Sequence, residues 1–231
     1  MRGYPTVVGH RGWPNRFPDN TLAGFLAAAT VADSVETDVR RSGDGKLVLF
    51  HDPVVDGLVV ADNAWSVLAE LDLGEGNRPA LLDEALAAIP GTGFQLEVKN
   101  LPHEPGFEPD HRIALDTAER ARPGDMVTSF NWVTLTAVRR VFPEMATGVL
   151  VGASGDVDQA IEQCLEHGHV ALLPSIHLPA PGLARALDAG LEVYPWVVDD
   201  STLIDELADL GVSGIISDDP AGARSALERV R

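Results

Sequence analysis

The feature that most constrains the fold of this chain is a regular alternation of strand-like apolar runs with helix-like segments. This alternation is typical of a parallel sheet covered by helices, because each parallel crossover needs room for a helix. An eight-stranded barrel would account for all the strand-like runs but one. The runs lie at residues 7–10, 34–39, 47–51, 94–99, 126–130, 146–151, 170–174, 192–198 and 214–217.

The surplus run is explained by the short link that precedes residues 47–51. Residues 40–46 are rich in turn-forming residues and too few for a parallel crossover, which takes about a dozen residues or more. We therefore predict that residues 47–51 pair antiparallel with the second strand, as a hairpin extension that folds over the barrel mouth. The other runs then form the barrel.

Helical patterns fill the gaps between the predicted strands, and either Asn20 or Thr21 is suited to cap the first helix. With 231 residues and no convincing linker, the chain is predicted to form one α/β domain over residues 1–231, a (β/α)8 TIM barrel. Residues 54–79 are expected to be irregular, with a helical turn at 66–71. The predicted helices cover residues 22–29, 81–89, 111–121, 131–141, 157–167, 182–189 and 202–210, and a last one opens at Asp219 and Pro220.

The charge balance argues against several classes of partner. Lys and Arg total 17 against 35 for Asp and Glu, a formal net charge of -18 that would repel nucleic acids and anionic membrane surfaces. No stretch reaches the roughly 20 apolar residues of a membrane span, and the first strand follows the N-terminus directly. We expect a cytoplasmic protein that acts on a small molecule, with no nucleic-acid partner and no stable membrane insertion.

Acidic residues occur inside two of the predicted strands. Glu36 and Asp38 are two residues apart and share a face, as do Glu97 and Lys99. Because apolar neighbours such as Val35 take the outer face against the helices, these polar side chains are predicted to point into the barrel. Three carboxylates suit one hard divalent cation, Mg²⁺ or Ca²⁺. The alternative is an internal ion-pair network with Lys99 and Arg11 and no metal.

Two histidines, His10 and His51, each close an apolar run and are therefore expected at strand ends near the acids. Histidine titrates near neutral pH, so a convergent pair can give and take protons within one reaction. His167 and His169 instead precede a strand and are expected at the opposite end of the barrel. Asp218 is predicted to cap the last helix, because Asp before a helix start accepts backbone N–H groups.

These motifs together resemble the glycerophosphodiester phosphodiesterase family, a group within the PLC-like phosphodiesterase superfamily. The strongest are His10-Arg11-Gly12, Glu36-Thr37-Asp38-Val39, His51-Asp52 and Leu96-Glu97-Val98-Lys99, and weaker ones are Ser129-Phe130, Tyr194-Pro195-Trp196-Val197-Val198 and Gly214-Ile215-Ile216-Ser217-Asp218. The resemblance spans almost the whole chain. One departure is Asp19, in Pro18-Asp19-Asn20-Thr21, where the family usually has Glu.

The resemblance implies a barrel enzyme that hydrolyses glycerophosphodiesters to an alcohol and glycerol phosphate. It implies a divalent cation at Glu36, Asp38 and Glu97, and active-site residues at the carboxyl ends of the strands. In the mechanism we expect, His10 and His51 are the catalytic acid and base, in either order, on opposite sides of the scissile P–O bond. The expected substrate-binding residues are Arg11 and Lys99 at the phosphate and Trp196 as an apolar wall.

Two alternatives remain open on the same scaffold. One is a lysophospholipase D-type enzyme that accepts lysophospholipids, which an apolar groove beside Trp196 would favour. The other is a non-catalytic phosphate-binding module, although His10, His51 and the three acids are all present. The alcohol head group, the preferred cation and the oligomeric state are not predicted.

Overall fold

A computed structural model of the protein describes residues 4–229. In it, parallel strands form a curved sheet in the order β10-β9-β8-β7-β6-β2-β1-β11. Backbone hydrogen bonds from Ser213 N to Val193 O and from Ile216 N to Pro195 O bridge the remaining seam, so the predicted α/β barrel is confirmed. The strands are β1 (Thr6–Gly9), β2 (Ser34–Arg41), β6 (Gly93–Val98), β7 (Met126–Ser129), β8 (Ala146–Val151), β9 (Ala171–Pro174), β10 (Glu192–Val193) and β11 (Gly214–Ser217).

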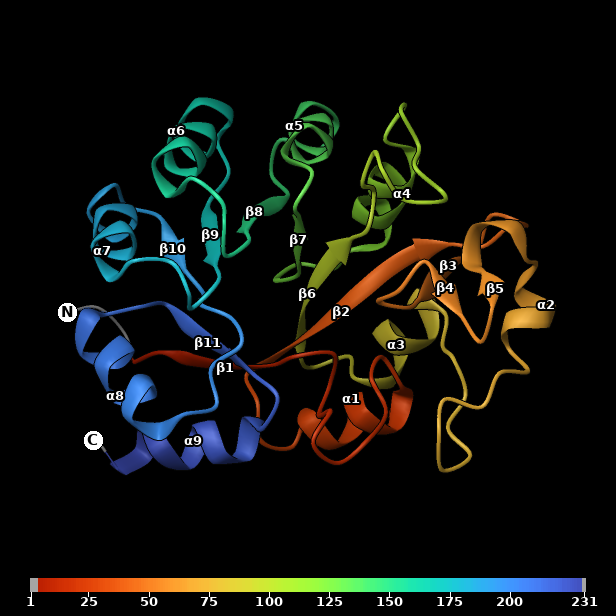
Figure 1. The fold of residues 1–231 in the computed structure, drawn as a ribbon, viewed down its shortest axis with the longest axis horizontal. Helices are drawn as coiled ribbons and strands as arrows, with labels where there is room; N and C mark the ends of the chain where they lie inside the picture. Colours follow the sequence, from red (N-terminus) through yellow and green to blue (C-terminus); the bar gives the residue numbers. More distant parts are fainter. Residues whose placement is uncertain (1–3, 230–231) are drawn as a thin grey trace.

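Helices surround this sheet on its outer side (Figure 1). Their starts follow local capping rules, since Thr21 Oγ1 accepts a hydrogen bond from Gly24 N, and Asp156 and Asp200 cap two later helices in the same way. The predicted helices agree with the observed ones to within two residues. These are α1 (Leu22–Ala28), α3 (Leu82–Ala88), α4 (Arg112–Arg120), α5 (Trp132–Val141), α6 (Val157–His167), α7 (Ala180–Asp188), α8 (Ser201–Leu210) and α9 (Pro220–Arg229).

The predicted hairpin extension is also present. Strand β3 (Leu47–Leu49) pairs antiparallel with the end of β2, with Val39 opposite Leu49 and Arg41 opposite Leu47. It lies off the barrel path. The hairpin therefore carries the chain back alongside the carboxyl end of β2, as the short link required.

The segment after this hairpin is more regular than we predicted. Strands β4 (Val54–Val55) and β5 (Leu58–Val59) form a small antiparallel sheet, followed by η1 (Val60–Asp62) and α2 (Trp65–Leu68). Both residues of the connecting turn, Asp56 and Gly57, have positive φ values of 49° and 77°. An Asp-Gly turn of this kind fits the twist of paired strands. Two-residue strands are too short to show an alternating pattern, which is why the sequence did not reveal them.

The core has two main parts, one between the sheet and the helices and one inside the barrel. Phe25 of α1 meets Phe94 of β6 edge to face in the outer part, with ring centroids 5.6 Å apart. Inside the barrel, apolar side chains such as Val8, Leu173 and Ile216 pack together. Within residues 4–229, no helix is long and apolar enough to cross a membrane.

Candidate active site

Three carboxylates meet inside the barrel, as the strand pattern predicted. Glu36 and Asp38 lie on β2 and Glu97 on the neighbouring β6, where Asp38 is in register with Glu97. All three are buried, and one oxygen from each lies within 4.8 Å of the other two. Carboxylates packed this closely repel each other unless positive charge lies among them.

The electrostatics of the cluster reflect this crowding. Burial and the Asp38 charge raise the pKa of Glu36 to about 8, against the pull of His10. Burial also raises the pKa of Glu97, partly offset by Lys99. Burial alone would raise the pKa of Asp38 as well, but Lys99 and Arg11 hold it below the usual range. The cluster thus keeps one carboxylate ionised and disfavours charge on the other two.

Two basic side chains lie within this cluster. Lys99 Nζ is 2.9 Å from Asp38 Oδ1 and 2.5 Å from Glu97 Oε1. Arg11 Nε is 3.3 Å from Asp38 Oδ2, and Arg11 Nη1 donates to Asp19 at 2.8 Å. The shorter Asp19 side chain therefore still reaches Arg11. The ion pairs of our metal-free alternative exist, but they do not satisfy every acid.

Glu36 supplies the evidence that the cluster could hold a cation. Its Oε2 accepts a hydrogen bond from Arg11 N at 2.9 Å, whereas its buried Oε1 has no hydrogen-bond partner among the described residues. An unpartnered buried oxygen beside two further carboxylates is the donor set that hard divalent cations prefer. The residues present thus fit Mg²⁺ or Ca²⁺.

Asn20 supports the cluster from the loop before α1, a role that sequence reasoning missed. Its Nδ2 donates to Asp38 Oδ2 at 2.9 Å, and its Oδ1 accepts from Thr37 Oγ1 at 2.7 Å and from Asp38 N at 3.1 Å. The residue has a φ of 59°, a conformation that Asn tolerates better than most residues. Thr21 is the helix cap, so Asn20 is free for this contact.

His10 follows β1 and is held by a residue from the other end of the chain. Its Nδ1 lies 2.6 Å from Asp218 Oδ1, and its Nε2 is 4.0 Å from Glu36 Oε2. Burial lowers the pKa of His10, but the hydrogen bond with Asp218 and the charge of Glu36 outweigh it, so the net shift is upward. The prediction that Asp218 caps the last helix is wrong. Asp219 directly precedes α9, and its carbonyl accepts the helical hydrogen bond from Ala223 N.

His51 follows the hairpin strand and lines the same cavity as His10, Glu36 and Glu97. A positive charge on His51 lowers the pKa of Asp38 and Glu97, whereas a positive charge on His10 lowers the pKa of Glu36. Its Nδ1 is 2.8 Å from Oδ1 of Asp52, a side chain that is 71% exposed. The two histidines therefore border the same acidic cluster from different strands.

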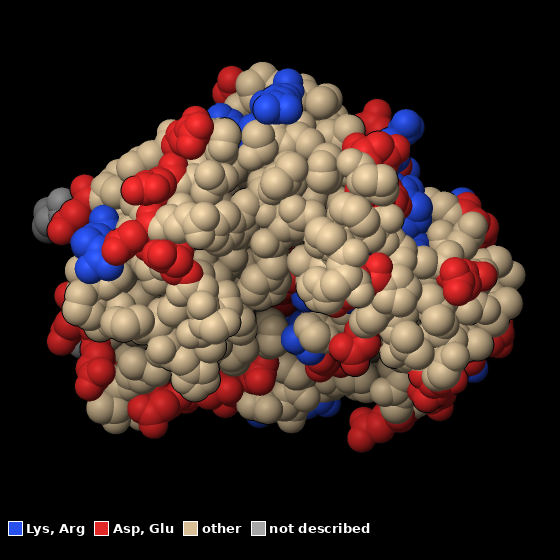
Figure 2. All heavy atoms as spheres, turned by 45° about the horizontal axis from the view of Figure 1, so that its top comes forward, with Lys and Arg blue, Asp and Glu red and all other residues tan. Residues whose placement is uncertain are grey.

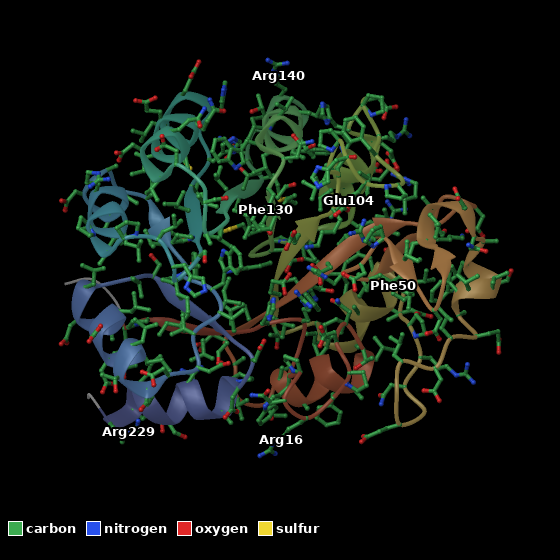
Figure 3. All side chains as sticks on the ribbon, viewed as in Figure 1. Arg16, Phe50, Glu104, Phe130, Arg140 and Arg229 are labelled. Carbon is green, nitrogen blue, oxygen red and sulfur yellow. The ribbon has the colours of Figure 1, made fainter. Side chains whose placement is uncertain are left out.

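One cavity of about 140 Å³ brings these groups together. Its polar wall carries the two histidines, Glu36, Glu97 and the basic side chains of Arg11 and Lys99, and the remaining wall is largely apolar. Phe130 and Trp196 meet edge to face in that apolar wall, at 5.7 Å between ring centroids, and Trp196 Nε1 donates to Leu173 O. Figure 3 shows Phe130 toward the middle of the barrel, whereas Arg16, Arg140 and Arg229 lie at the outer edge of the molecule. The polar wall consists of His10, Arg11, Glu36, His51, Glu97 and Lys99.

One face of the molecule is unevenly charged. The face shown in Figure 2 is hollowed near its middle, with charged side chains at and below the hollow and largely uncharged surface above it. Acidic side chains are otherwise spread along the margin, in keeping with the formal net charge of -18.

A closed α/β barrel with a polar cavity beside the strand ends is the architecture of a barrel enzyme. Residues 10–222 match the model of the Glycerophosphoryl diester phosphodiesterase family. The chain belongs to this family of hydrolases, which confirms the resemblance carried by its motifs.

Individual relatives agree over nearly the full length. A glycerophosphodiester phosphodiesterase of Caldanaerobacter subterraneus subsp. tengcongensis is 29% identical over 231 residues, covering 93% of this chain and 94% of the relative. The structure of an Oleispira antarctica phosphodiesterase in complex with the product sn-glycerol-3-phosphate matches with a TM-score of 0.86 and 25% identity, covering 97% of each chain. A glycerophosphodiester phosphodiesterase from Parabacteroides distasonis shares the fold, with a TM-score of 0.85 at 21% identity and full coverage of both chains.

Proposed function

We propose that this protein hydrolyses glycerophosphodiesters to an alcohol and glycerol phosphate, with His10 and His51 as the acid and base. The proposal is supported chiefly by the cavity that these histidines share with Arg11, Lys99 and two of the three acids, Glu36 and Glu97. The Oleispira antarctica relative, which was solved with sn-glycerol-3-phosphate as product, supports the choice of substrate class.

The two histidines divide the proton transfers. One accepts a proton from the attacking hydroxyl group, of water or of the neighbouring glycerol carbon, as its oxygen bonds to phosphorus, and the other donates a proton to the departing alcohol oxygen as the second P–O bond breaks. If the glycerol hydroxyl attacks, water then opens the resulting cyclic phosphate to give glycerol phosphate. His10 is suited to either role through Nε2, because Asp218 engages its Nδ1. Neither the nucleophile nor the leaving group then has to carry a full negative charge in the cavity.

Arg11 and Lys99 are the proposed phosphate ligands. The guanidinium of Arg11 offers several donors in one plane, and the Lys99 ammonium offers a compact charge. Burial lowers the pKa of Lys99, but Glu97 and Asp38 outweigh it, so the pKa is raised and the ammonium stays charged. Phe130 and Trp196 are the proposed apolar wall for the glycerol or alcohol carbon atoms.

Glu36, Asp38 and Glu97 are the proposed ligands of one Mg²⁺ or Ca²⁺ ion. When bound, such a cation supplies positive charge that stabilises the charge developing on the phosphate oxygens. It would also satisfy the buried Glu36 Oε1, which lacks a hydrogen-bond partner in the described part of the chain.

The test is hydrolysis of glycerophosphocholine by the purified protein with Mg²⁺, with Ca²⁺ and with a chelator. We expect turnover that needs a cation and falls about 100-fold or more in His10→Ala and His51→Ala. His167→Ala is the matched control, since His167 ends α6 and lies outside the lining of the cavity. A wild-type protein that is inactive on a panel of glycerophosphodiesters under every metal would instead support a non-catalytic phosphate-binding module.

A groove beside the cavity favours lysophospholipids as a second candidate substrate class. It has a volume of about 720 Å³, within the usual range for ligand sites, and it shares Phe130 with the catalytic cavity. None of the described residues that line it is Asp, Glu, Lys or Arg, although the chain is strongly charged. Leu101, Trp132 and Val133 give it an apolar surface suited to an acyl chain.

Val133 and Val141 allow a matched test, because both are exposed on α5 but only Val133 lines this groove. We expect Val133→Lys to lower the ratio of kcat/KM for lysophosphatidylcholine to that for glycerophosphocholine about tenfold, because a charge in the groove opposes an apolar chain. Val141→Lys should leave the ratio unchanged. An unchanged ratio in both variants would remove the support for lysophospholipids and leave the diester activity standing.

A further inference from the structure

Arg40 is a buried charged residue outside the catalytic cavity that the proposed chemistry does not use. It lies near the end of β2, two residues beyond Asp38, and only 5% of its side chain is exposed. Burying a guanidinium is costly unless it is paired and hydrogen-bonded. Its partners therefore indicate what the residue does.

Those partners connect Arg40 to the proposed catalytic machinery. Arg40 Nε and Nη2 both donate to the backbone oxygen of His51, at 3.0 and 2.6 Å. Nη2 also donates to Glu104 Oε2 at 2.9 Å. One guanidinium thus ties the carbonyl of His51 to strand β2 and to the loop that follows β6, where Figure 3 labels Glu104.

The position of His51 explains why this contact matters. The β2–β3 ladder ends at Leu49, and Phe50 N still donates to Asp38 O at 3.2 Å, so His51 lies just beyond the regular pairing. A backbone position outside the ladder is not fixed by strand pairing. The two hydrogen bonds from Arg40 hold the backbone of His51 instead.

The two histidines differ in what orients them. His10 has a side-chain partner, Asp218, at 2.6 Å on a half-buried carboxylate. The only side-chain hydrogen bond of His51 within residues 4–229 goes to Asp52, which is 71% exposed. An exposed hydrogen bond competes with water and holds a ring weakly. The imidazole of His51 therefore depends mainly on where its backbone is held.

We propose that Arg40, supported by Glu104, is a positioning residue that fixes His51 at the catalytic cavity through its main-chain carbonyl. This role rests on the proposed function, in which His51 transfers a proton. Arg40 does not touch the substrate in this proposal. Misplacing a catalytic group by about 1 Å can cost about 100-fold in rate. Loss of the Arg40 hydrogen bonds to the His51 carbonyl should therefore lower kcat.

Arg41 provides the matched control, because it neighbours Arg40 and forms ion pairs with Glu108 and Asp116 but does not contact His51. With Mg²⁺ present, we expect Arg40→Gln to lower kcat for glycerophosphocholine about tenfold to 100-fold, with KM changed less than about threefold. Arg41→Gln should change kcat less than about threefold. Arg40→Lys, which can donate one hydrogen bond to the carbonyl, should recover part of the loss.

Glu104→Gln keeps the proposal testable if Arg40→Gln does not fold. Its side chain is partly exposed, so the variant should fold, and it should lower kcat in the same direction but less than Arg40→Gln. Equal losses in Arg40→Gln and Arg41→Gln would indicate a general structural role and overturn the proposal. Wild-type kcat in both Arg40→Gln and Glu104→Gln would overturn it as well.

A second readout does not depend on turnover. Imidazole ¹⁵N–¹H NMR spectra should show altered His51 ring signals in Arg40→Gln, with His10 signals unchanged, and neither set altered in Arg41→Gln. Undisturbed His51 signals in Arg40→Gln would overturn the positioning role even in an active enzyme. If the wild type hydrolyses no diester, the proposed function fails, and the NMR result still decides whether Arg40 holds His51.

Discussion

The Nδ1 atom of His10 lies 2.6 Å from Oδ1 of Asp218, although 208 positions separate the two residues in the sequence. They meet because β1 pairs in parallel with β11, with Gly9 opposite Ser217, so the residues after both strands are neighbours. Asp199 Oδ1 in turn accepts hydrogen bonds from Ser217 Oγ and Asp218 N, which holds the Asp218 loop. The pairing of β1 with β11, which closes the barrel on this side, therefore also orients His10.

Replacing Asp218 with Asn should reduce activity while leaving the fold intact. The variant keeps a similar shape but removes the negative charge of the carboxylate. That charge favours a proton on Nδ1 of His10. We expect kcat/KM for glycerophosphocholine to fall about tenfold to 1,000-fold. Because the contact with Asp218 opposes the lowering effect of burial on the pKa of His10, its loss should also move the corresponding limb of the pH–rate profile to lower pH.

Asp219→Asn is the control for this prediction. It changes the adjacent acid, which directly precedes α9 and forms no side-chain hydrogen bond or ion pair with His10 among the described residues. Equal activity losses in the two variants would contradict an orienting role for Asp218.

Asn20 offers a test of the acidic cluster. Asn20→Gly removes the amide that holds Asp38, and glycine accepts the positive φ of 59° without strain. Groups that orient metal ligands typically contribute tenfold to 100-fold in affinity, so we expect Mg²⁺ or Ca²⁺ binding to weaken by about tenfold. Calorimetric titration with each metal measures this directly. Unchanged affinity would mean that Asp38 is held well enough by Lys99 and Arg11.

The fold and the acids could be predicted from the sequence because both follow from local periodicity. Alternation along β2 and β6 determines that Glu36, Asp38 and Glu97 face inward, and the short link after β2 leaves only an antiparallel partner. The contacts of Asp218 and Asn20 could not be predicted in this way. Ser217-Asp218-Asp219-Pro220 offers two acids to one helix start, and only barrel closure assigns one of them to His10.

Cation binding should depend on pH, and the affinity should rise with pH because the carboxylates must lose their protons. In the metal-free protein the pKa of Glu36 is raised to about 8, and that of Glu97 is also raised, because both are buried beside other acids. At pH 6 a cation must displace the proton of Glu36. Affinity should therefore increase from pH 6 to about 8 and then level off.

Calorimetry at pH 7 in two buffers of different ionisation enthalpy measures the protons released. We expect release of about one proton per cation bound. In Glu36→Gln the affinity should be lower and its pH dependence weaker, because both a ligand and a titrating group are gone. A wild-type affinity that is the same at pH 6 and pH 8 would contradict the arrangement of charges described for the cluster.

His169 makes a separate prediction about stability in acid, far from the cavity. It precedes β9, as expected for the opposite end of the barrel, and its Nδ1 lies 2.8 Å from Thr147 Oγ1. Its Nε2 is buried without a hydrogen-bond partner among residues 4–229. A protonated ring would bury a charge with an unpaired donor. Burial, with smaller effects of His167 and Arg139, accordingly lowers the pKa of His169 to about 4.

The folded state thus keeps His169 neutral, whereas the unfolded chain takes up a proton near pH 6.5. Its contribution to stability is complete above pH 6.5 and is lost progressively as the pH falls toward 4, by about 3 kcal/mol in all. Urea unfolding of the wild type and of His169→Gln at pH 7 and pH 4.5 isolates this contribution. We expect the variant to lose about 2 kcal/mol less than the wild type over that interval, since carboxylate effects are common to both.

His103→Gln, on an exposed loop, should behave like the wild type. Parallel losses in His169→Gln and the wild type would show that His169 titrates normally in the folded protein.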